Sequence, residues 1–143
     1  MTPQDMAETH AAAFTQSRPW SAEEFSNLIA NRFTHVVGDK RSFALIQVIG
    51  EEAELLTIAT RPDYQRRGLA RRIMADWHAK ARELGAIRAF LDVASDNHSA
   101  ISLYQTCGYT PCGNRAAYYH RKSGPNADAI VMERPLSEKY SLF

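Results

Sequence analysis

The segment at residues 65–70, QRRGLA, combines arginines and a glycine in an order that suits the binding of an anion. It lies between a stretch of β character and the longest amphipathic helical pattern, so it is expected at the start of a helix. The first turn of a helix leaves N–H groups unpaired and carries partial positive charge, and Gly68 lets a bulky ligand approach the backbone. The alternative is an ordinary helix start with solvated arginines, and the segment alone does not decide between the two. A ligand with several phosphates is the functional prediction, held with the help of Arg66, Arg67, Arg71 and Arg72.

Four helices are predicted along the chain. The spacing of apolar residues, and the turn residues that interrupt it, place them at about 6–14, 21–31, 68–85 and 97–105. Ser21 and Glu24 form a capping box at the second helix, in which the hydroxyl and the carboxylate each bind the other residue's amide. The third helix carries one apolar stripe, formed by Leu69, Ile73, Trp77, Ala81 and Leu84.

Six runs of β character separate these helices, at 33–37, 42–49, 53–60, 87–93, 108–112 and 127–133. Short loops that contain glycine join the first three, which predicts an antiparallel meander. The last two are expected to be joined through Tyr118 and Tyr119 and a polar loop at 123–126. Strands on both sides of a crossover helix imply the α/β class, with a mixed sheet covered by helices.

Composition limits the possible functions. The chain has 143 residues and a formal net charge of +1, from 17 Lys and Arg against 16 Asp and Glu. This length predicts one domain, and the balanced charge argues against a general nucleic-acid binder. No apolar run approaches the roughly 20 residues that span a bilayer, and no secretory signal is recognisable, so we expect a cytoplasmic protein without membrane contact. Cys107 and Cys112 lack metal-ligand spacing, and no zinc site is expected.

The pattern at residues 65–70 resembles motif A of the GCN5-related N-acetyltransferases (GNAT), with Ala70 where many members have glycine. A dinucleotide-binding fingerprint would need three glycines at set positions. A second segment continues the resemblance, with LDV at 91–93, Asn97, AISLY at 100–104 and GY at 108–109. The resemblance implies the GNAT fold, a mixed and mostly antiparallel central sheet flanked by helices. It also implies acetyl-coenzyme A as co-substrate and no metal.

The resemblance further implies which residues bind acetyl-coenzyme A. The backbone of one strand edge is expected to hold the pantetheine arm, at Ile58, Ala59 and Thr60. Asn97 is expected to contact the co-substrate through its amide, although it is also a good cap for the following helix. The pyrophosphate is expected on the backbone amides of the motif, at Arg66, Arg67, Gly68, Leu69, Ala70 and Arg71.

Two catalytic roles are carried over by the same resemblance. Asp92 falls at the position of the base, where the members compared usually have Glu, and its shorter side chain is expected to act directly or through a water. A strand-end carboxylate satisfied by nearby backbone is an equal alternative. Tyr104, twelve residues later, is expected to donate a proton to the departing thiolate. Its alternative is a tyrosine packed on a helix face.

A closer resemblance, from about His10 to Leu136, is to those members that acetylate the N-terminal alanine of a ribosomal protein. It is carried by PWS at 19–21, by IAT at 58–60 ahead of PDYQR, and by RAAYY at 115–119 ahead of DAI at 128–130. It implies one N-acetyltransferase domain over residues 1–136, a tail at 137–143, and protein eighteen of the small ribosomal subunit as substrate. Arg115, Tyr118 and Tyr119 are expected to border the peptide channel, with packing on the sheet surface as the alternative.

The chemistry of the acceptor amine fits a site with a single modest base. An α-amino group has a pKa near 8, against about 10.4 for lysine, so at pH 7 roughly one N-terminal amine in ten is already neutral. The rival predictions within the enzyme class are another protein N-terminus, a lysine or a small amine. Rivals from other classes are a non-catalytic acyl-coenzyme A sensor and a nucleic-acid binder that uses residues 66–72.

Overall fold

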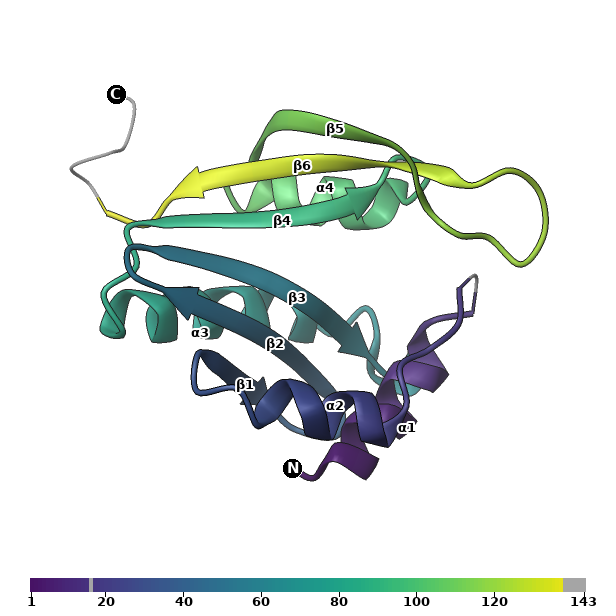
Figure 1. The fold of residues 1–143 in the computed structure, drawn as a ribbon, viewed down its shortest axis with the longest axis horizontal. Coiled ribbons are helices and arrows are strands. Elements are labelled where there is room, and N and C mark those ends of the chain that lie inside the picture. Colours follow the sequence, from purple (N-terminus) through teal and green to yellow (C-terminus); the bar gives the residue numbers. More distant parts are fainter. Residues whose placement is uncertain (16, 138–143) are drawn as a thin grey trace.

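The computed structural model of the protein describes residues 1–15 and 17–137. Its core element is one six-stranded sheet with the strand order β1-β2-β3-β4-β6-β5 (Figure 1). The pairings are antiparallel except for β3 with β4, which are parallel. The α/β class and the mixed, mostly antiparallel sheet are therefore confirmed. The elements in chain order are α1 (Pro3–Ala13), α2 (Ala22–Ile29), β1 (Thr34–Gly38), β2 (Ser42–Ile49), β3 (Glu52–Thr60), a short 3-10 turn η1 (Pro62–Tyr64), α3 (Leu69–Glu83), β4 (Arg88–Ala94), α4 (His98–Thr106), β5 (Thr110–Tyr119) and β6 (Ala127–Pro135).

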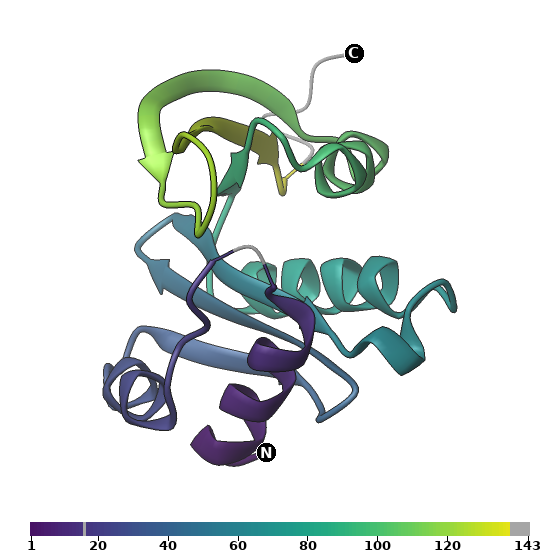
Figure 2. The same ribbon diagram turned by 90° about the vertical axis from the view of Figure 1, so that its right-hand side faces the viewer.

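The helices cover the two faces of the sheet unequally. Figure 2 shows α3 and α4 on one side of the sheet and α1 and α2 on the other. The face under α1 and α2 carries a cluster built around Met6, Phe25 and Phe43, toward the β1 edge. The main contacts of α1 and α2 with the sheet are to β3 and β1, and residues of β4, β5 and β6 on the same face line a hollow. A stretch of sheet surface is therefore left open beside α1 and α2.

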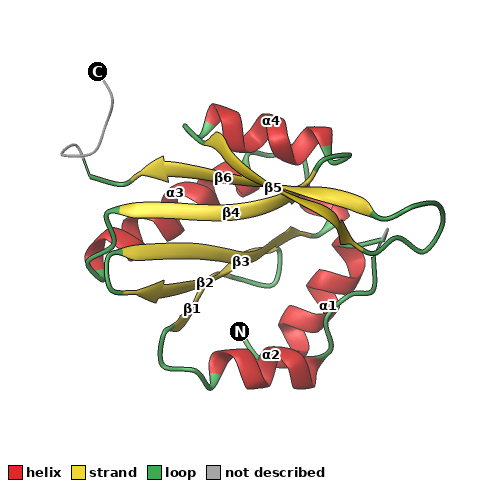
Figure 3. Ribbon diagram, turned by 45° about the horizontal axis from the view of Figure 1, so that its top comes forward, coloured by secondary structure: helices red, strands yellow, loops and turns green. Residues whose placement is uncertain are grey.

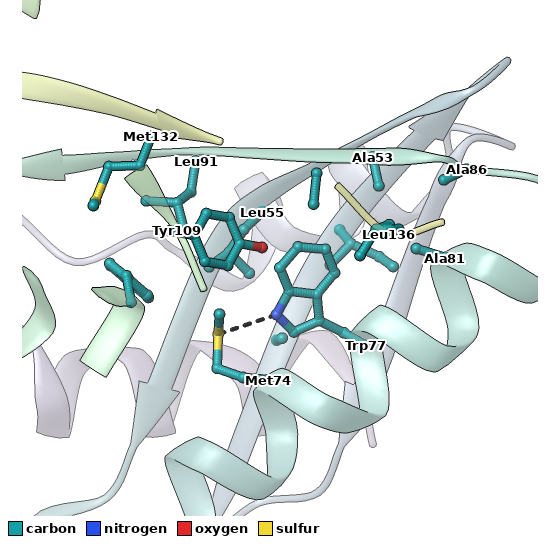
Figure 4. Close-up of a cluster of buried hydrophobic side chains, with 14 of the residues drawn as sticks. Ala53, Leu55, Met74, Trp77, Ala81, Ala86, Leu91, Tyr109, Met132 and Leu136 are labelled. Carbon is teal, nitrogen blue, oxygen red and sulfur yellow. Dashed lines mark hydrogen bonds between the residues drawn. The ribbon is translucent and has the colours of Figure 1, made fainter. Parts of the chain in front are cut away.

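The main core lies between α3 and the sheet (Figure 4). Trp77 is fully buried there, and its indole N–H donates to the sulfur of Met74 over 3.2 Å. Of the predicted apolar stripe of α3, Ile73, Trp77 and Ala81 are buried as expected. Leu84 is 40% exposed because the helix ends one residue earlier. Truncation of such a large buried side chain to alanine typically costs about 3–5 kcal/mol, so this core fixes α3 against the sheet.

A buried histidine ties α1 to the middle of β3. The ring of His10 accepts a hydrogen bond at Nδ1 from the Trp20 backbone N–H (3.0 Å), so the proton of the neutral ring is on Nε2. Nε2 then donates to the Thr57 hydroxyl over 3.2 Å. The ring also stacks on Phe14, with centroids 3.9 Å apart. Burial lowers the pKa of His10 to about 4, which keeps the ring neutral at physiological pH.

The capping box at α2 is confirmed. The Ser21 hydroxyl accepts from the Glu24 amide over 3.2 Å, and the Glu24 carboxylate accepts from the Ser21 amide over 3.1 Å. The predicted end of the fifth strand at residue 112 is wrong, because β5 continues through Tyr118 and Tyr119. The polar loop that follows is therefore the tip of a long hairpin. Of the predicted tail, residues 138–143 lie outside the described residues.

Candidate active site

The two parallel strands at the centre of the sheet part from each other. Their pairing covers four residues of each strand, from Glu52 opposite Arg88 to Leu55 opposite Leu91. Beyond this point β3 continues to Thr60 and β4 to Ala94 without pairing to each other, and the two ribbons diverge in Figure 1. An irregularity in the β2–β3 register next to Leu56 accompanies the separation. Residues 58–60 therefore have no strand partner on the side of β4, which leaves this edge open to backbone hydrogen bonds from a ligand, although the Thr60 carbonyl already accepts one from the Gln65 side-chain amide over 3.1 Å.

The predicted anion-binding turn stands at the end of β3. Gly68 precedes the first residue of α3 with φ +78°, a left-handed conformation that glycine adopts without strain. A Cβ built on Gly68 would meet no atom within 4 Å, so the approach to this turn is open. Arg66 is also left-handed, at φ 62°. Arg66, Arg67 and Arg71 are all exposed beside the uncapped amides of the helix start. Backbone and charge together therefore suit a phosphate-rich ligand.

A hollow of about 420 Å³ opens on the uncovered face of the sheet, on the side of α1 and α2. Asp92 of β4 lines it, with its side chain 17% exposed, and the Arg115 Nε lies 3.8 Å from its Oδ1. Both interpretations of Asp92, as a base and as a carboxylate with a structural role, stay predictions. Glu54 and Phe90 also line the hollow, so polar and aromatic surfaces meet in it.

Glu54 is a second carboxylate at this position that the sequence analysis missed. Partial loss of hydration raises the pKa of Glu54, and the negative charge of Asp92 adds to this while Arg115 opposes it. Glu54 occupies an outward position of a regularly alternating strand, which in a sequence is typical of solvated surface. Glu54 pairs with Phe90 of β4, and this register places the Glu54 side chain in the same hollow as Asp92.

Tyr104 lies on the inner face of α4 and is 6% exposed, with its ring 6.1 Å from that of Tyr109. Burial raises the pKa of Tyr104 above its usual range, and Tyr119 and Cys107 contribute in the same direction. Its phenol is therefore protonated at neutral pH, and the same burial places Tyr104 in the main core, as the alternative of a packed tyrosine expects. Burial likewise raises the pKa of Tyr119 to about 12, with Asp92 the next contributor.

A network of polar contacts around Arg121, called the Arg121 clasp below, joins three loops through Asp96, Ser17 and the His120 carbonyl. The guanidinium of Arg121, 10% exposed, binds both oxygens of Asp96, at 2.7 and 3.2 Å. It also donates to the Ser17 hydroxyl over 3.0 Å, and that hydroxyl donates to the carbonyl of His120 over 3.1 Å. The clasp therefore connects the α1–α2 loop, the β4–α4 turn and the β5–β6 hairpin. This network could not be predicted from local sequence patterns, because Ser17 and Arg121 are 104 residues apart.

The other residues singled out from the sequence have contacts of their own in the structure. Asn97 caps α4, and its side-chain oxygen accepts from the Ala100 amide over 3.2 Å. Tyr118 is 52% exposed and meets Tyr119 edge-on, with centroids 5.1 Å apart. Cys107 and Cys112 are both free. Within residues 1–15 and 17–137, no group of three or more His, Cys, Asp or Glu could hold a metal ion, and none of the helices described is long and apolar enough to cross a membrane.

Residues 5–109 match the Acetyltransferase (GNAT) family, and the chain therefore belongs to that family of N-acetyltransferases. The chain is 34% identical over 134 residues to the [ribosomal protein bS18]-alanine N-acetyltransferase of Escherichia coli K12, covering 91% of this chain and 87% of that protein. It is also 34% identical over 140 residues to the N-alpha-acetyltransferase RimI of Mycobacterium tuberculosis, covering 92% and 85%.

The fold is similar to the crystal structure of the ribosomal-protein-S18-alanine N-acetyltransferase from Escherichia coli. The TM-score is 0.84 and the identity 28%, with 99% of this chain and 93% of the other covered. The predicted GNAT fold and enzyme class are thus confirmed.

Proposed function

We propose that this N-acetyltransferase uses acetyl-coenzyme A to acetylate the N-terminal alanine of protein eighteen of the small ribosomal subunit. The observation that carries the proposal is the position of Asp92, in a hollow on the open face at the point where β3 and β4 part. The names of the relatives support the choice of a protein N-terminus as acceptor. Since ribosomal proteins are made in the cytoplasm, the proposal places the enzyme there, as a single domain over residues 1–136.

In this proposal, acetyl-coenzyme A enters between the separated strands from the side of α3 and α4. The turn at 66–71 binds its pyrophosphate, because the amides at the start of α3 and three exposed arginines face outward there. The free edge of β3 at 58–60 binds the pantetheine amides. Asn97 follows the end of β4 by three residues, and its side-chain amide contacts the same pantetheine arm while its oxygen caps α4.

The acceptor amine approaches from the hollow on the opposite face. Asp92 accepts a proton from the α-ammonium or from the attacking amine, directly or through a water. The amine nitrogen forms a bond to the thioester carbon, and the carbon–sulfur bond breaks. An α-ammonium loses two protons on the way to a neutral amide, one before attack and one as the carbon–nitrogen bond forms; Asp92 takes one of them and water takes the other. Tyr104 gives its phenolic proton to the departing sulfur, so that no free thiolate is left, and its phenolate then regains a proton from water. Arg115, Tyr118 and Tyr119 border the path of the peptide.

A competition between acceptors tests the proposal. Purified protein and acetyl-coenzyme A are incubated with a peptide that begins with alanine, the same peptide with a blocked N-terminus and one internal lysine, and a polyamine, and products are identified by mass spectrometry. Acetylation of the free alanine terminus alone is expected. Preference for lysine or for the polyamine would refute the substrate. Binding of acetyl-coenzyme A without turnover on any amine would refute catalysis.

The natural substrate is tested in cells. The amino termini of ribosomal proteins are compared by mass spectrometry between cells with the gene, cells without it, and cells that express Tyr104→Phe. Loss of the acetyl group from protein eighteen in the second and third strains is expected. An unchanged terminus in all three would show that the substrate is another protein.

A further inference from the structure

The last two strands pair irregularly opposite Asp128 of β6. Arg115 pairs with Ala129 and Tyr119 pairs with Ala127, so the three residues 116–118 of β5 face a single residue of β6. Regular pairing would place only one residue there. Such bulges bend a strand and redirect its side chains, and they are frequent beside active sites. In Figure 3, β5 twists across β6 on its way to the hairpin.

The middle residue of this bulge has an unfavourable backbone. Ala117 has φ +50°, in the left-handed region that residues with a Cβ rarely occupy. The carboxylate of Asp128 compensates, because its Oδ1 accepts a hydrogen bond from the Ala117 amide over 2.7 Å. This length is typical of a hydrogen bond to a charged acceptor. The backbone N–H that the bulge removes from the strand pairing thus has a side-chain partner.

The bulge determines where Tyr119 lies. Two additional residues lie between Arg115 and Tyr119, so a regular strand would carry Tyr119 about 7 Å further along, into the hairpin. With the bulge, Tyr119 lies opposite Ala127, half-buried, on the face of the sheet where Arg115 meets Asp92. In this position the Tyr119 ring also lies 5.7 Å from the guanidinium of Arg121.

We propose that Asp128 is a positioning residue, which holds Ala117 in its left-handed conformation and thereby places Tyr119 at the acceptor site. Its catalytic consequence rests on the proposed function, whereas its structural part, that the bulge depends on this carboxylate oxygen, does not. Asp128 takes no part in the reaction itself. It acts through the backbone of β5.

Three variants test the proposal. Asp128→Ala removes the acceptor and loosens the bulge, and we expect kcat/KM for the alanine peptide to fall on the order of 10- to 100-fold, because even a misplacement of about 1 Å can cost on the order of 100-fold. Asp128→Asn keeps an oxygen at the same position and is expected to stay within about threefold of the unmodified enzyme. Ala117→Gly removes the backbone strain, and in combination with Asp128→Ala it is expected to restore most of the lost kcat/KM.

The loss must be specific to the acceptor. KM for acetyl-coenzyme A is expected to stay within about twofold in every variant, because residues 58–60 and 66–71 lie outside the bulge. An equal loss in Asp128→Asn and Asp128→Ala, failure of Ala117→Gly to restore activity, or a parallel rise of KM for acetyl-coenzyme A would each overturn the proposal.

A second measurement separates this proposal from the function itself. Hydrogen exchange followed by NMR reports the Ala117 amide, which is expected to be protected in the unmodified protein and in Asp128→Asn and to exchange rapidly in Asp128→Ala. The Tyr119 ring signals are expected to shift only in Asp128→Ala. If the unmodified protein acetylates no amine, the proposed function fails while these signals still decide the role of Asp128. Equal protection of Ala117 in all the variants would refute it.

Discussion

Two buried histidines predict that the protein loses stability in mild acid. Burial lowers the pKa of His10 to about 4 and that of His78 to about 3, in the second case with help from Arg134 and Arg82. Each ring has a partner, the Thr57 hydroxyl for His10 and the Tyr109 hydroxyl, at 2.7 Å, for His78. In the unfolded chain both rings take up a proton near pH 6.5. The stability that they contribute is therefore present above pH 6.5 and lost as the pH falls toward 4 and 3.

The expected loss is large compared with the stability of an ordinary domain. At pH 4.5 the unfolded chain gains about 2.5 kcal/mol from protonation of each histidine, because the unfolded ring is almost fully charged while the folded ring is mostly neutral. The two together lower the free energy of unfolding by about 5 kcal/mol between pH 7.5 and 4.5. Typical domains have about 5–15 kcal/mol in total, so the expected loss is between about one third and all of the stability of such a domain.

Urea denaturation at pH 7.5, 6.5, 5.5 and 4.5 measures this loss. The double variant His10→Asn, His78→Gln keeps a polar atom near each bonding position but cannot titrate, and its free energy of unfolding is expected to change by less than about 1 kcal/mol over the series. Each single variant is expected to show about half of the full slope. His98→Gln, at an exposed position of α4, is the control and should behave as the unmodified protein. A double variant that loses stability as steeply as the unmodified protein would refute the assignment to these two rings.

Three further predictions concern catalysis. Tyr104→Phe is expected to lower kcat by on the order of 10²–10⁴-fold, the usual contribution of a proton donor, with KM for acetyl-coenzyme A little changed; an unaltered kcat in steady-state assays would remove Tyr104 as the acid. Asp92→Asn is expected to flatten the acidic limb of the pH–rate profile, and Glu54→Gln is the matched comparison; if only Glu54→Gln flattens it, the base is Glu54. Gly68→Val is expected to raise KM for acetyl-coenzyme A without unfolding the protein, since its cost is a strained φ at an open position; an unchanged KM would place the pyrophosphate elsewhere.

Local patterns in the sequence were enough to predict most of the elements. Ser21 and Glu24 marked the start of α2, and the spacing of Ile73, Trp77 and Ala81 marked the buried side of α3, because caps and helical periodicity are properties of neighbouring residues. The end of β5 was mispredicted for a local reason as well. Pro111 and Gly113 are depleted in strands, and they interrupt the β pattern although the pairing with β6 continues past them.

The candidate site was less predictable because its contacts are distant in sequence. The resemblance gave Asp92 and Tyr104 their roles, which remain predictions. It gave no sign of Glu54, whose place in the hollow depends on the register of β3 beside β4, nor of the Arg121 clasp. The bulge at Ala117 could not be predicted either, because it depends on Asp128 eleven residues later in the chain.

The order of the strands has one further consequence. The first half of the sheet is made only from residues before α3 ends, and the second half only from residues after it, so the polypeptide crosses the line between β3 and β4 once, through the connection at 84–87. Two fragments divided there would each carry a complete three-stranded half-sheet with one side of the gap. A ligand bound in that gap would contact both fragments, so the affinity of the separated fragments for each other should increase when the ligand is added.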